Sequence, residues 1–293
     1  MGNLKEVRIR ISSTISTQQI TKAMKLVSAT KLRKAQSAIM QMRPYADKLN
    51  GVLKNLSDSV DDEKLAVYFK EKSLSRVLLV VVSSDRGLCG GFNANIIKRT
   101  KLLLNDEYQE LVAAKKVDVL FVGKKAFEAL KKTDLNLNTD FISAFSNLTA
   151  ETGFAIGDYI MEKFLDGTYS RVEVVYNKFK NAATQIVSNE VLLPVTIKSG
   201  SAQKGPEKDY IFEPNKIEIL EELIPRSIKT QLYRSMLDSF ASEHGARMIA
   251  MDKATDNAGE ILKQLKLQYN RGRQAAITNE ISEIVGGAAA LNS

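Results

Sequence analysis

The last quarter of the chain constrains the fold most, because no proline follows Pro225 in the 293-residue sequence. Apolar or small residues recur there every three or four positions, the spacing that places side chains on one face of a helix: Ala254, Ala258, Ile261, Leu265, Tyr269, Gly272 and Ala276. Pro225 suits the first turn of a helix. A helix over most of residues 225–293 would span on the order of 100 Å at about 1.5 Å per residue, which exceeds a compact domain.

The first part of the chain shows the same helical spacing. Its apolar positions before the first proline, Pro44, are Leu4, Val7, Ile11, Ile15, Ile20, Ala23, Val27, Ala35, Ile39 and Met42. Periodic patterns longer than about 25 residues without stop signals indicate a coiled coil. Two such segments at opposite ends of the chain most simply pair antiparallel, so we expect a long antiparallel coiled coil. Ordinary helices of an all-helical domain are the alternative.

The middle of the chain predicts an α/β domain inserted between the two helices. SRVLLVVVSS (75–84) is a continuous apolar, β-branched run, typical of a strand buried on both faces of a parallel sheet. Further strands are expected at 117–123, 171–179 and 184–195, and helices from the turn at 84–93 to about 104, at 123–132 and around 150–166. Alternating strands and helices are typical of α/β folds.

The predicted organisation therefore has four parts. SGSAQKGPEKDY (199–210) is rich in turn residues and predicts an exposed loop. The expected division is a 1–58 N-terminal coiled-coil helix, a 74–200 Rossmann-like α/β globular domain, a 201–224 loop and linker, and a 225–293 C-terminal coiled-coil helix.

Basic charge is concentrated on the predicted N-terminal helix. Residues 1–54 contain 11 Lys or Arg and 2 Asp or Glu, whereas the whole chain has a net charge of +8. A basic coiled coil implies an acidic partner, either nucleic acid or an acidic protein surface, bound more weakly as salt is added. A solvated helix face is the alternative explanation of these charges.

The composition is that of a soluble chain in a reducing compartment. Cys89 is the only cysteine, so no internal disulfide can form. No apolar run approaches the roughly 18 residues of a membrane span, and the N-terminus lacks the apolar core of a secretory signal. A mitochondrial leader is rejected because the same basic residues belong to the helical pattern.

The turn SDRGLCGGFN (84–93) is the one place where the residues suggest chemistry. A glycine-rich turn after a strand can hold a phosphate at a helix N-terminus. Gly87, Gly90 and Gly91 lack the G-x-G-x-x-G spacing, however, and the sequence has no GK[ST] motif. A structural tight turn is therefore favoured over a nucleotide site.

Catalysis by this chain alone is not predicted. Cys89 beside Arg86 is a candidate activated thiolate, but His244, the only histidine, is expected on a helix surface or at an interface, away from Cys89. The sequence contains no HExxH, GxSxG or CxxC motif. We therefore predict no catalytic residue, no metal ligand and no bound cofactor.

The C-terminal run ITNEISEIVGGAAA (277–290) resembles a family signature. It fits the I-T-x-E-x-x-E-x-x-x-G-A-x-A pattern of the γ subunit of F-type ATP synthases through Thr278, Glu280, Glu283, Gly287, Ala288 and Ala290. SEHGARMIAMDKATDNAGEIL (242–262) and YNRGRQAAITNE (269–280) are similar to that family's C-terminal helix. VRIRISSTISTQQITKAMKLVSATKLRKAQ (7–36) resembles its N-terminal helix, and SSDRGLCGGFN (83–93) resembles its first strand and turn; residues from about 100 to 220 match mainly in pattern.

The resemblance to the bacterial type of this family implies a rotor shaft. In the family, the terminal helices stand as a coiled coil inside a hexameric ring of α and β subunits. The α/β domain sits on the membrane ring of c subunits, with the ε subunit as a further partner. The chain would be non-catalytic, would couple ion flow to ATP synthesis or hydrolysis on the β subunits, and would be peripheral on the cytoplasmic face of the inner membrane. The coupling ion, H⁺ or Na⁺, is bound by other subunits.

The resemblance also assigns contacts with the β subunit. Arg273, Gln274 and Thr278 match family positions that hydrogen-bond a loop of β, while Met24 and Arg247 match positions tied to coupling. A basic row on the N-terminal helix would meet acidic lever loops of β: Lys22, Lys25, Lys31, Arg33 and Lys34. For each residue, coil packing or solvent exposure is the alternative.

A basic coiled-coil nucleic-acid-binding protein is the rival function, because a basic coil with an inserted domain could grip phosphate. The interleaved aromatic residues expected for single-strand binding are missing, since few aromatics lie on the helices outside Tyr45, Tyr233, Phe240 and Tyr269.

Overall fold

A computed structural model describes residues 4–57, 63–70, 73–195 and 215–291. The chain divides into two compact units. Residues 1–28 and 248–293 form one, here called the coil unit, and residues 29–247 form the other, the sheet unit. The later part of the N-terminal helix, from residue 29, and the early part of the C-terminal helix, up to residue 247, therefore belong to the same unit as the sheet. The predicted loop at 199–210 lies outside the described residues.

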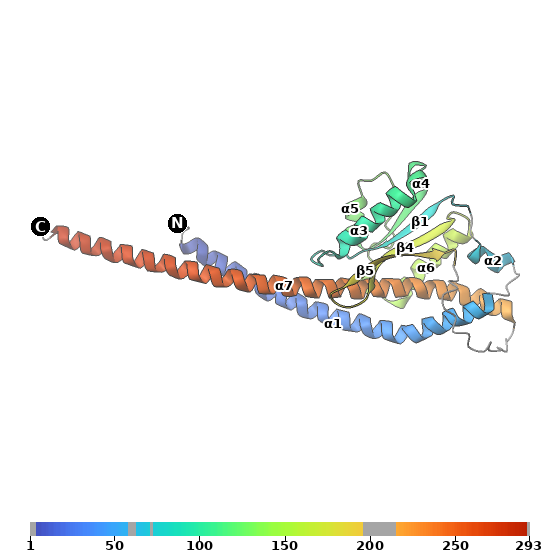
Figure 1. Cartoon of the computed structure of the whole chain (residues 1–293), viewed down its shortest axis with the longest axis horizontal. Helices are drawn as coiled ribbons and strands as arrows, with labels where there is room; N and C mark the ends of the chain where they lie inside the picture. Colours follow the sequence, from blue (N-terminus) through green and yellow to red (C-terminus); the bar gives the residue numbers. More distant parts are fainter. Residues whose placement is uncertain (1–3, 58–62, 71–72, 196–214, 292–293) are drawn as a thin grey trace. The chain divides into compact units, whose positions relative to one another are not determined.

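Two long helices enclose an α/β arrangement in the chain order (Figure 1). The elements are α1 (Leu4–Ser57), α2 (Glu63–Phe69), β1 (Val77–Val82), α3 (Phe92–Leu102), the π-helical segment η1 (Leu103–Glu107), α4 (Gln109–Ala113), β2 (Val117–Val122), α5 (Lys124–Leu130), β3 (Asn136–Asn138), the 3₁₀ segment η2 (Ala144–Asn147), α6 (Ala150–Leu165), β4 (Arg171–Phe179), β5 (Gln185–Leu193) and α7 (Lys216–Leu291).

The sheet has the strand order β3-β2-β1-β4-β5. Its first four strands are parallel, in a register that pairs Val77 with both Val117 and Arg171. The expectation of a parallel sheet is wrong for β5, which pairs antiparallel with β4. The short turn between them cannot hold a crossover. The amides of Ala183 and Thr184 donate to the Asn181 side chain and close a hairpin instead.

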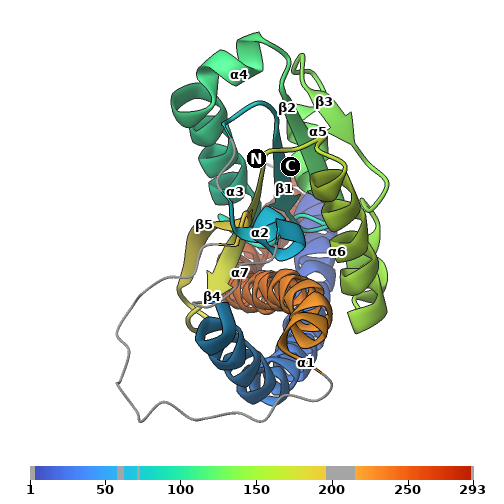
Figure 2. The same ribbon diagram turned by 90° about the vertical axis from the view of Figure 1, so that its right-hand side faces the viewer.

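Helices cover both faces of the sheet, as the α3 and α6 labels in Figure 2 show. One face packs against α6 and the inner part of α7, through residues that include Leu78, Ile156 and Leu232. The other face packs against α3 and α5, through residues that include Leu79 and Ile96. All six residues of β1 and of β2 are buried, because helices on both sides exclude water from these mainly apolar strands. The one charged residue among them, Asp118 in β2, is paired with Arg76.

The predicted start of the C-terminal helix at Pro225 is wrong. Helix α7 begins at Lys216, so Pro225 lies inside it and the last part of the expected 201–224 linker is helical. The backbone amide of Glu218 donates to Asn215 Oδ1 at 2.9 Å, and the side-chain Nδ2 of Asn215 donates to Glu218 Oε1 at 2.6 Å. The first bond satisfies a backbone donor that a helix start leaves unpaired, and the second holds the capping side chain in place.

The coil unit confirms the antiparallel coiled coil. Contacts along α1 pair with steadily earlier positions on α7. Leu4 lies against Gly272, where an added Cβ would come within 3.2 Å of the leucine side chain. Further along, Arg8 donates to the Tyr269 hydroxyl at 2.7 Å. Val7 is also buried there, as the spacing predicts.

The middle of the coil unit differs from the predicted apolar face. Ile20 and Val27 are 59% and 57% exposed, and Ala23 is exposed as well. The contacts instead come from a polar row: Gln18, Thr21 and Lys25 on α1 with Asp252 and Thr255 on α7. The contact face of α1 therefore runs through residues one or two positions after the predicted Ile20, Ala23 and Val27. On α7, Ile261 is likewise exposed, and Leu262 is half-buried.

Candidate functional site

The C-terminal part of α7 presents the residues predicted to meet the β subunit. Arg273, Gln274 and Thr278 are all exposed. The Thr278 hydroxyl donates to the backbone carbonyl of Gln274 at 2.9 Å, within the helix. These side chains are held on one helix but not buried, so their polar groups are accessible for contacts outside the chain.

The family-signature residues lie further along the same helix. Glu280, Glu283, Gly287 and Ala288 are exposed, and Ala290 lies in the last turns of α7. Large apolar side chains between them are exposed too: Ile277 at 46%, Ile281 at 57%, Ile284 at 66% and Val285 at 62%. Such a concentration of exposed isoleucine and valine is typical of a surface that another protein covers.

The outer face of α1 in the coil unit carries a second apolar group. Ile9, Ile20, Leu26 and Val27 are each between 57% and 61% exposed. Single exposed apolar residues are common on soluble proteins. Four on a short length of one helix, together with the apolar end of α7, indicate that the coil unit is a contact surface.

Met24 and Lys25, two predicted coupling residues, lie between the buried and exposed faces of α1. The Lys25 ammonium contacts Asp252 at 2.5 Å across the coil, with both side chains partly exposed. Lys25 is therefore already part of the polar row, while Lys22, Lys31, Arg33 and Lys34 are exposed. These four side chains are accessible for contacts outside the chain, and their contact with β stays a prediction.

Arg247 has a different environment from the other predicted coupling residues. It is 7% exposed and lies in the sheet unit. Its Nη1 donates to Glu243 Oε1 at 2.5 Å, and its Nη2 donates to the backbone carbonyls of Arg86 and Gly87 at 3.1 and 3.3 Å. The side chain that the sequence suggested for a partner thus holds the glycine-rich turn of its own chain.

The glycine-rich turn is a structural turn, as the sequence favoured. Ser84 donates from its hydroxyl to the Arg86 carbonyl at 2.6 Å, and its amide donates to the Asn93 side chain at 3.1 Å. Burial raises the pKa of the Cys89 thiol, which makes it a poor nucleophile. Among the described hydrogen bonds, those of the Cys89 thiol are with Ser84, Asn93 and the Arg86 carbonyl.

The prediction that His244 is a helix-surface or interface residue is wrong, because the side chain is 5% exposed. Its ring meets the Phe240 ring edge-on at 4.4 Å. Burial, with further contributions from Arg247 and Lys31, lowers the pKa of His244 to about 3. The imidazole is therefore neutral at physiological pH, and it serves packing rather than proton transfer.

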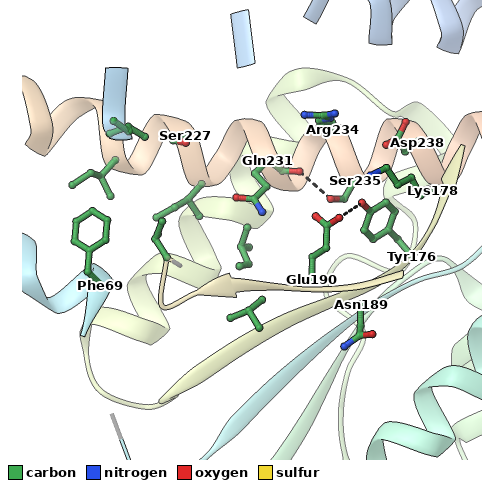
Figure 3. Close-up of a pocket in the computed structure, with 16 residues that line it drawn as sticks. Phe69, Tyr176, Lys178, Asn189, Glu190, Ser227, Gln231, Arg234, Ser235 and Asp238 are labelled. Carbon is green, nitrogen blue, oxygen red and sulfur yellow. Dashed lines mark hydrogen bonds between the residues drawn. The ribbon is translucent and has the colours of Figure 1, made fainter. Parts of the chain in front are cut away.

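A cavity of about 500 Å³ lies between β5 and α7 (Figure 3). Figure 3 shows Tyr176 and Glu190 pointing toward each other, and the tyrosine hydroxyl donates to Glu190 Oε1 at 2.8 Å. Ile224 and Ile228 are among its apolar lining residues. In the described part of the chain, no group of three or more His, Cys, Asp or Glu residues is placed to hold a metal ion. No described helix has the length and apolar character needed to cross a membrane.

Comparison with known proteins identifies the family. A model of the ATP synthase family matches residues 3–291. The ATP synthase gamma chain of Cytophaga hutchinsonii is 56% identical over 295 residues, covering 100% of both chains. The chain belongs to the ATP synthase gamma chain family. The gamma chain of Christiangramia forsetii is 53% identical, again over 100% of both chains.

Solved structures share the fold of this gamma chain family. A central stalk and c-ring structure of the Tetrahymena thermophila mitochondrial ATP synthase contains a chain 27% identical, with a TM-score of 0.58, covering 80% of this chain and 99% of that one. A chain of the Euglena gracilis mitochondrial ATP synthase is 22% identical, with a TM-score of 0.68, and covers 99% and 95%. The chain is a non-catalytic stalk subunit, and the comparisons give the nucleic-acid-binding alternative no support.

Proposed function

We propose that this chain is the rotating central shaft that couples ion flow through a membrane ring to ATP synthesis or hydrolysis. Its partners are the α and β subunits, the ε subunit and the c-subunit ring. The observation that carries the proposal is the exposed apolar and hydrogen-bonding surface of the coil unit, in a chain that gamma chains match over their full length.

Coupling through such a shaft requires only differential contacts. Each orientation of an asymmetric shaft favours one conformation of a neighbouring β subunit over another, which shifts a population without chemistry on the shaft itself. Coupling free energies are reciprocal, so nucleotide binding that changes β must also turn the shaft. The exposed charges of α1 and α7 provide the differential contacts. At physiological salt their electrostatic interactions are screened beyond about 8 Å, so only partner charges within that distance contribute.

We assign the direct β contacts to Met24, Lys25, Arg273, Gln274 and Thr278. Arg273 offers a planar, charged pair of donors suited to a carboxylate or carbonyl loop, and Gln274 and Thr278 follow it on the same helix. The exposed isoleucines beyond them would turn within an apolar sleeve of the ring. In a bacterium the complex would place this chain at the cytoplasmic face of the inner membrane, held there through its partners.

The first test is copurification. A tagged chain expressed in its own host should bring down α, β and ε in a complex with ATPase activity. Recovery of nucleic acid in place of these subunits, with binding to DNA that weakens on salt titration, would favour the rival function.

The second test addresses the assigned residues. Replacing Arg273 and Gln274 together by Ala should reduce coupled ATP synthesis several-fold while leaving assembly intact, because a charged hydrogen bond to a moving loop is lost and the coil face is kept. ATP synthesis by membrane vesicles and the subunit content of the purified complex are measured together. The control is Gln264→Ala, which alters an exposed polar residue of the same helix. Loss of the complex in the double variant would indicate a packing role instead.

A further inference from the structure

The glycine-rich turn between β1 and α3 has an unfavourable backbone at its apex. Leu88 has a φ of 62° and Gly90 a φ of 58°. Leucine rarely adopts a left-handed conformation, which costs on the order of 1–2 kcal/mol for a residue with a Cβ. The Leu88 side chain is also 65% exposed, so its own packing does not offset that cost. Other contacts must hold the turn in this conformation.

Arg247 supplies contacts of that kind from α7. Its Nη2 donates to two successive carbonyls of the turn, those of Arg86 and Gly87, directly before Leu88. Its Nη1 is held by Glu243, one helical turn earlier, and both side chains are more than nine-tenths buried. A guanidinium whose two terminal nitrogens both donate hydrogen bonds in this way has little freedom to move.

A second connection joins α7 to the same region. The Ser242 hydroxyl donates to the Asn177 carbonyl on β4 at 3.0 Å, and the Asn177 side chain donates to the Phe92 carbonyl at the start of α3. Gly245 permits close approach, since an added Cβ would lie 3.2 Å from Ala182 Cα in the β4–β5 turn. The last turns of α7 in the sheet unit are thus tied to both ends of the glycine-rich turn.

We infer that Arg247 is a positioning residue that locks the glycine-rich turn onto α7, and that torque passes between this helix and the sheet through the lock. The second half of the inference rests on the proposed rotor function. Apolar packing is non-directional and defines the rotation of a helix less sharply than directed hydrogen bonds do. The guanidinium is oriented by Glu243 on the same helix, and its hydrogen bonds to the Arg86 and Gly87 carbonyls favour one rotational setting of α7 against the turn.

Cys89 is a natural reporter for this lock. It is the only thiol in the chain, lies inside the turn and is 2% exposed. Its modification by a water-soluble maleimide therefore requires the turn to open. Burial raises the pKa of the Cys89 thiol and the positive charge of Arg247 partly opposes that shift, so removing this charge would by itself slow the reaction. A faster reaction in an Arg247 variant can then come only from opening.

The experiment compares Arg247→Met with Lys229→Met in the purified complex. Lys229 on α7 forms an ion pair with Asp158 on α6 at 2.5 Å, and the substitution is of the same kind. We expect Cys89 to react about tenfold faster or more in Arg247→Met, because charged hydrogen bonds that close the turn are lost. Lys229→Met should react at the wild-type rate. Equal rates in all three proteins, or equal increases in both variants, overturn the lock.

Global destabilisation is separated by the urea dependence of the Cys89 reaction. Modification through local opening is nearly independent of low urea concentrations, whereas modification through global unfolding rises steeply with urea. If Arg247→Met does not assemble, Arg247→Lys keeps the charge but not the paired donors, and an unchanged Cys89 rate in that variant contradicts the lock.

Torque transfer is tested in the same Arg247→Lys complex. Ion pumping per ATP hydrolysed should fall several-fold in membrane vesicles while ATPase activity is kept. A fast Cys89 reaction with normal pumping overturns torque transfer through the lock but leaves the rotor function standing. Failure of the wild-type chain to copurify with α and β removes the rotor function without affecting the Cys89 result.

Discussion

At the scale of single residues, the tightest backbone approach in the sheet unit is at Gly123, between β2 and α5. Its φ is 100°, and an added Cβ would lie 1.9 Å from the Ser83 carbonyl oxygen. Neither the conformation nor the space suits any other residue. The glycine thus allows the end of β2 to pass directly beside the end of β1.

Gly123→Ala should therefore destabilise the sheet unit strongly, by about 2–5 kcal/mol, because backbone strain and a steric clash add together. Urea unfolding of the purified protein measures this. Gly51→Ala is the matched control, because nothing lies within 4 Å of its Cβ position in α1, and it should stabilise by about 0.5–1 kcal/mol. A loss below 1 kcal/mol for Gly123→Ala would show that the backbone there can adjust.

Asp238 on α7 makes stability depend on pH. Burial raises the pKa of its carboxyl to about 6, with Arg234 and Lys178 opposing the shift. The pKa in the folded state lies above that of the unfolded chain, so the folded protein binds the proton more tightly. The free energy of unfolding should accordingly fall as pH rises from about 4 to about 6.

Asp238→Asn removes this titration. The variant should be more stable than wild type by on the order of 1–2 kcal/mol at pH 7.5, and equal to it near pH 4. Thermal or urea unfolding at both pH values measures the difference. Equal pH dependence of the two proteins would mean that Asp238 is charged and well solvated in the folded state.

Expectations for single residues were correct where they depended on residue type and motif spacing. They were wrong where they depended on which side of a helix is buried in the fold. The glycine-rich turn was correctly favoured as structural, since its spacing fits no phosphate motif. The burial of His244 and Arg247 was not foreseen, because a helix pattern does not show which side faces the sheet. One usable signal was present, Gly245 between the two residues, because a glycine on a helix permits close backbone contact on its face.

At the scale of elements, the long strands and helices were predictable and the short ones were not. β1 is an uninterrupted apolar run and β2 is apolar except for Asp118, whereas β3 has the sequence Asn-Leu-Asn over Asn136–Asn138 and pairs only at the sheet edge. The start of α7 was readable from the capping pattern of Asn215 and Glu218, but Pro225 competed with it as a first-turn residue. The face of α1 between Gln18 and Ser28 was mispredicted because polar residues form the contact there.

The exposed basic residues of α1 give a prediction for this element. If the basic residues act on acidic loops of β as proposed, replacing Arg33 and Lys34 together by Glu should lower coupled ion pumping. The effect should shrink as ionic strength rises, because the field of such charges is screened beyond about 8 Å at 0.15 M salt. ATP-driven pumping in membrane vesicles at low and high salt measures it. Lys115→Glu is the control, on an exposed lysine of the sheet unit. Wild-type pumping by the double variant at both salt concentrations would show that these charges only form a solvated helix face.

At the scale of the whole molecule, the coil unit exposes more apolar surface than an isolated protein tolerates well. Ile9, Ile20 and Val27 on α1 and Ile281 and Ile284 on α7 are all more than half exposed. Exposed groups of this kind promote association unless a partner covers them. The two-state stability of the chain alone is thus a poor guide to its stability in the complex.

The isolated chain should self-associate, and adding α and β should make it monodisperse and raise its Tm. Light scattering and thermal unfolding with and without the partner subunits measure both effects. A sharp single transition of a monomeric chain, unchanged by α and β, would contradict this expectation. Replacing Ile281 and Ile284 by Gln should reduce self-association of the chain alone, which identifies the surface responsible.

The polar row between the helices of the coil unit has a mechanical consequence. Apolar side chains attract one another at many relative positions, so an apolar coiled coil can slide along its axis by a turn at modest cost. The hydroxyl pair of Thr21 and Thr255, 2.7 Å apart, and the Lys25–Asp252 pair would both be separated by such a step, leaving polar groups without partners. The two helices therefore keep their axial register under load, and a twist applied at one end is stored elastically rather than lost as slippage.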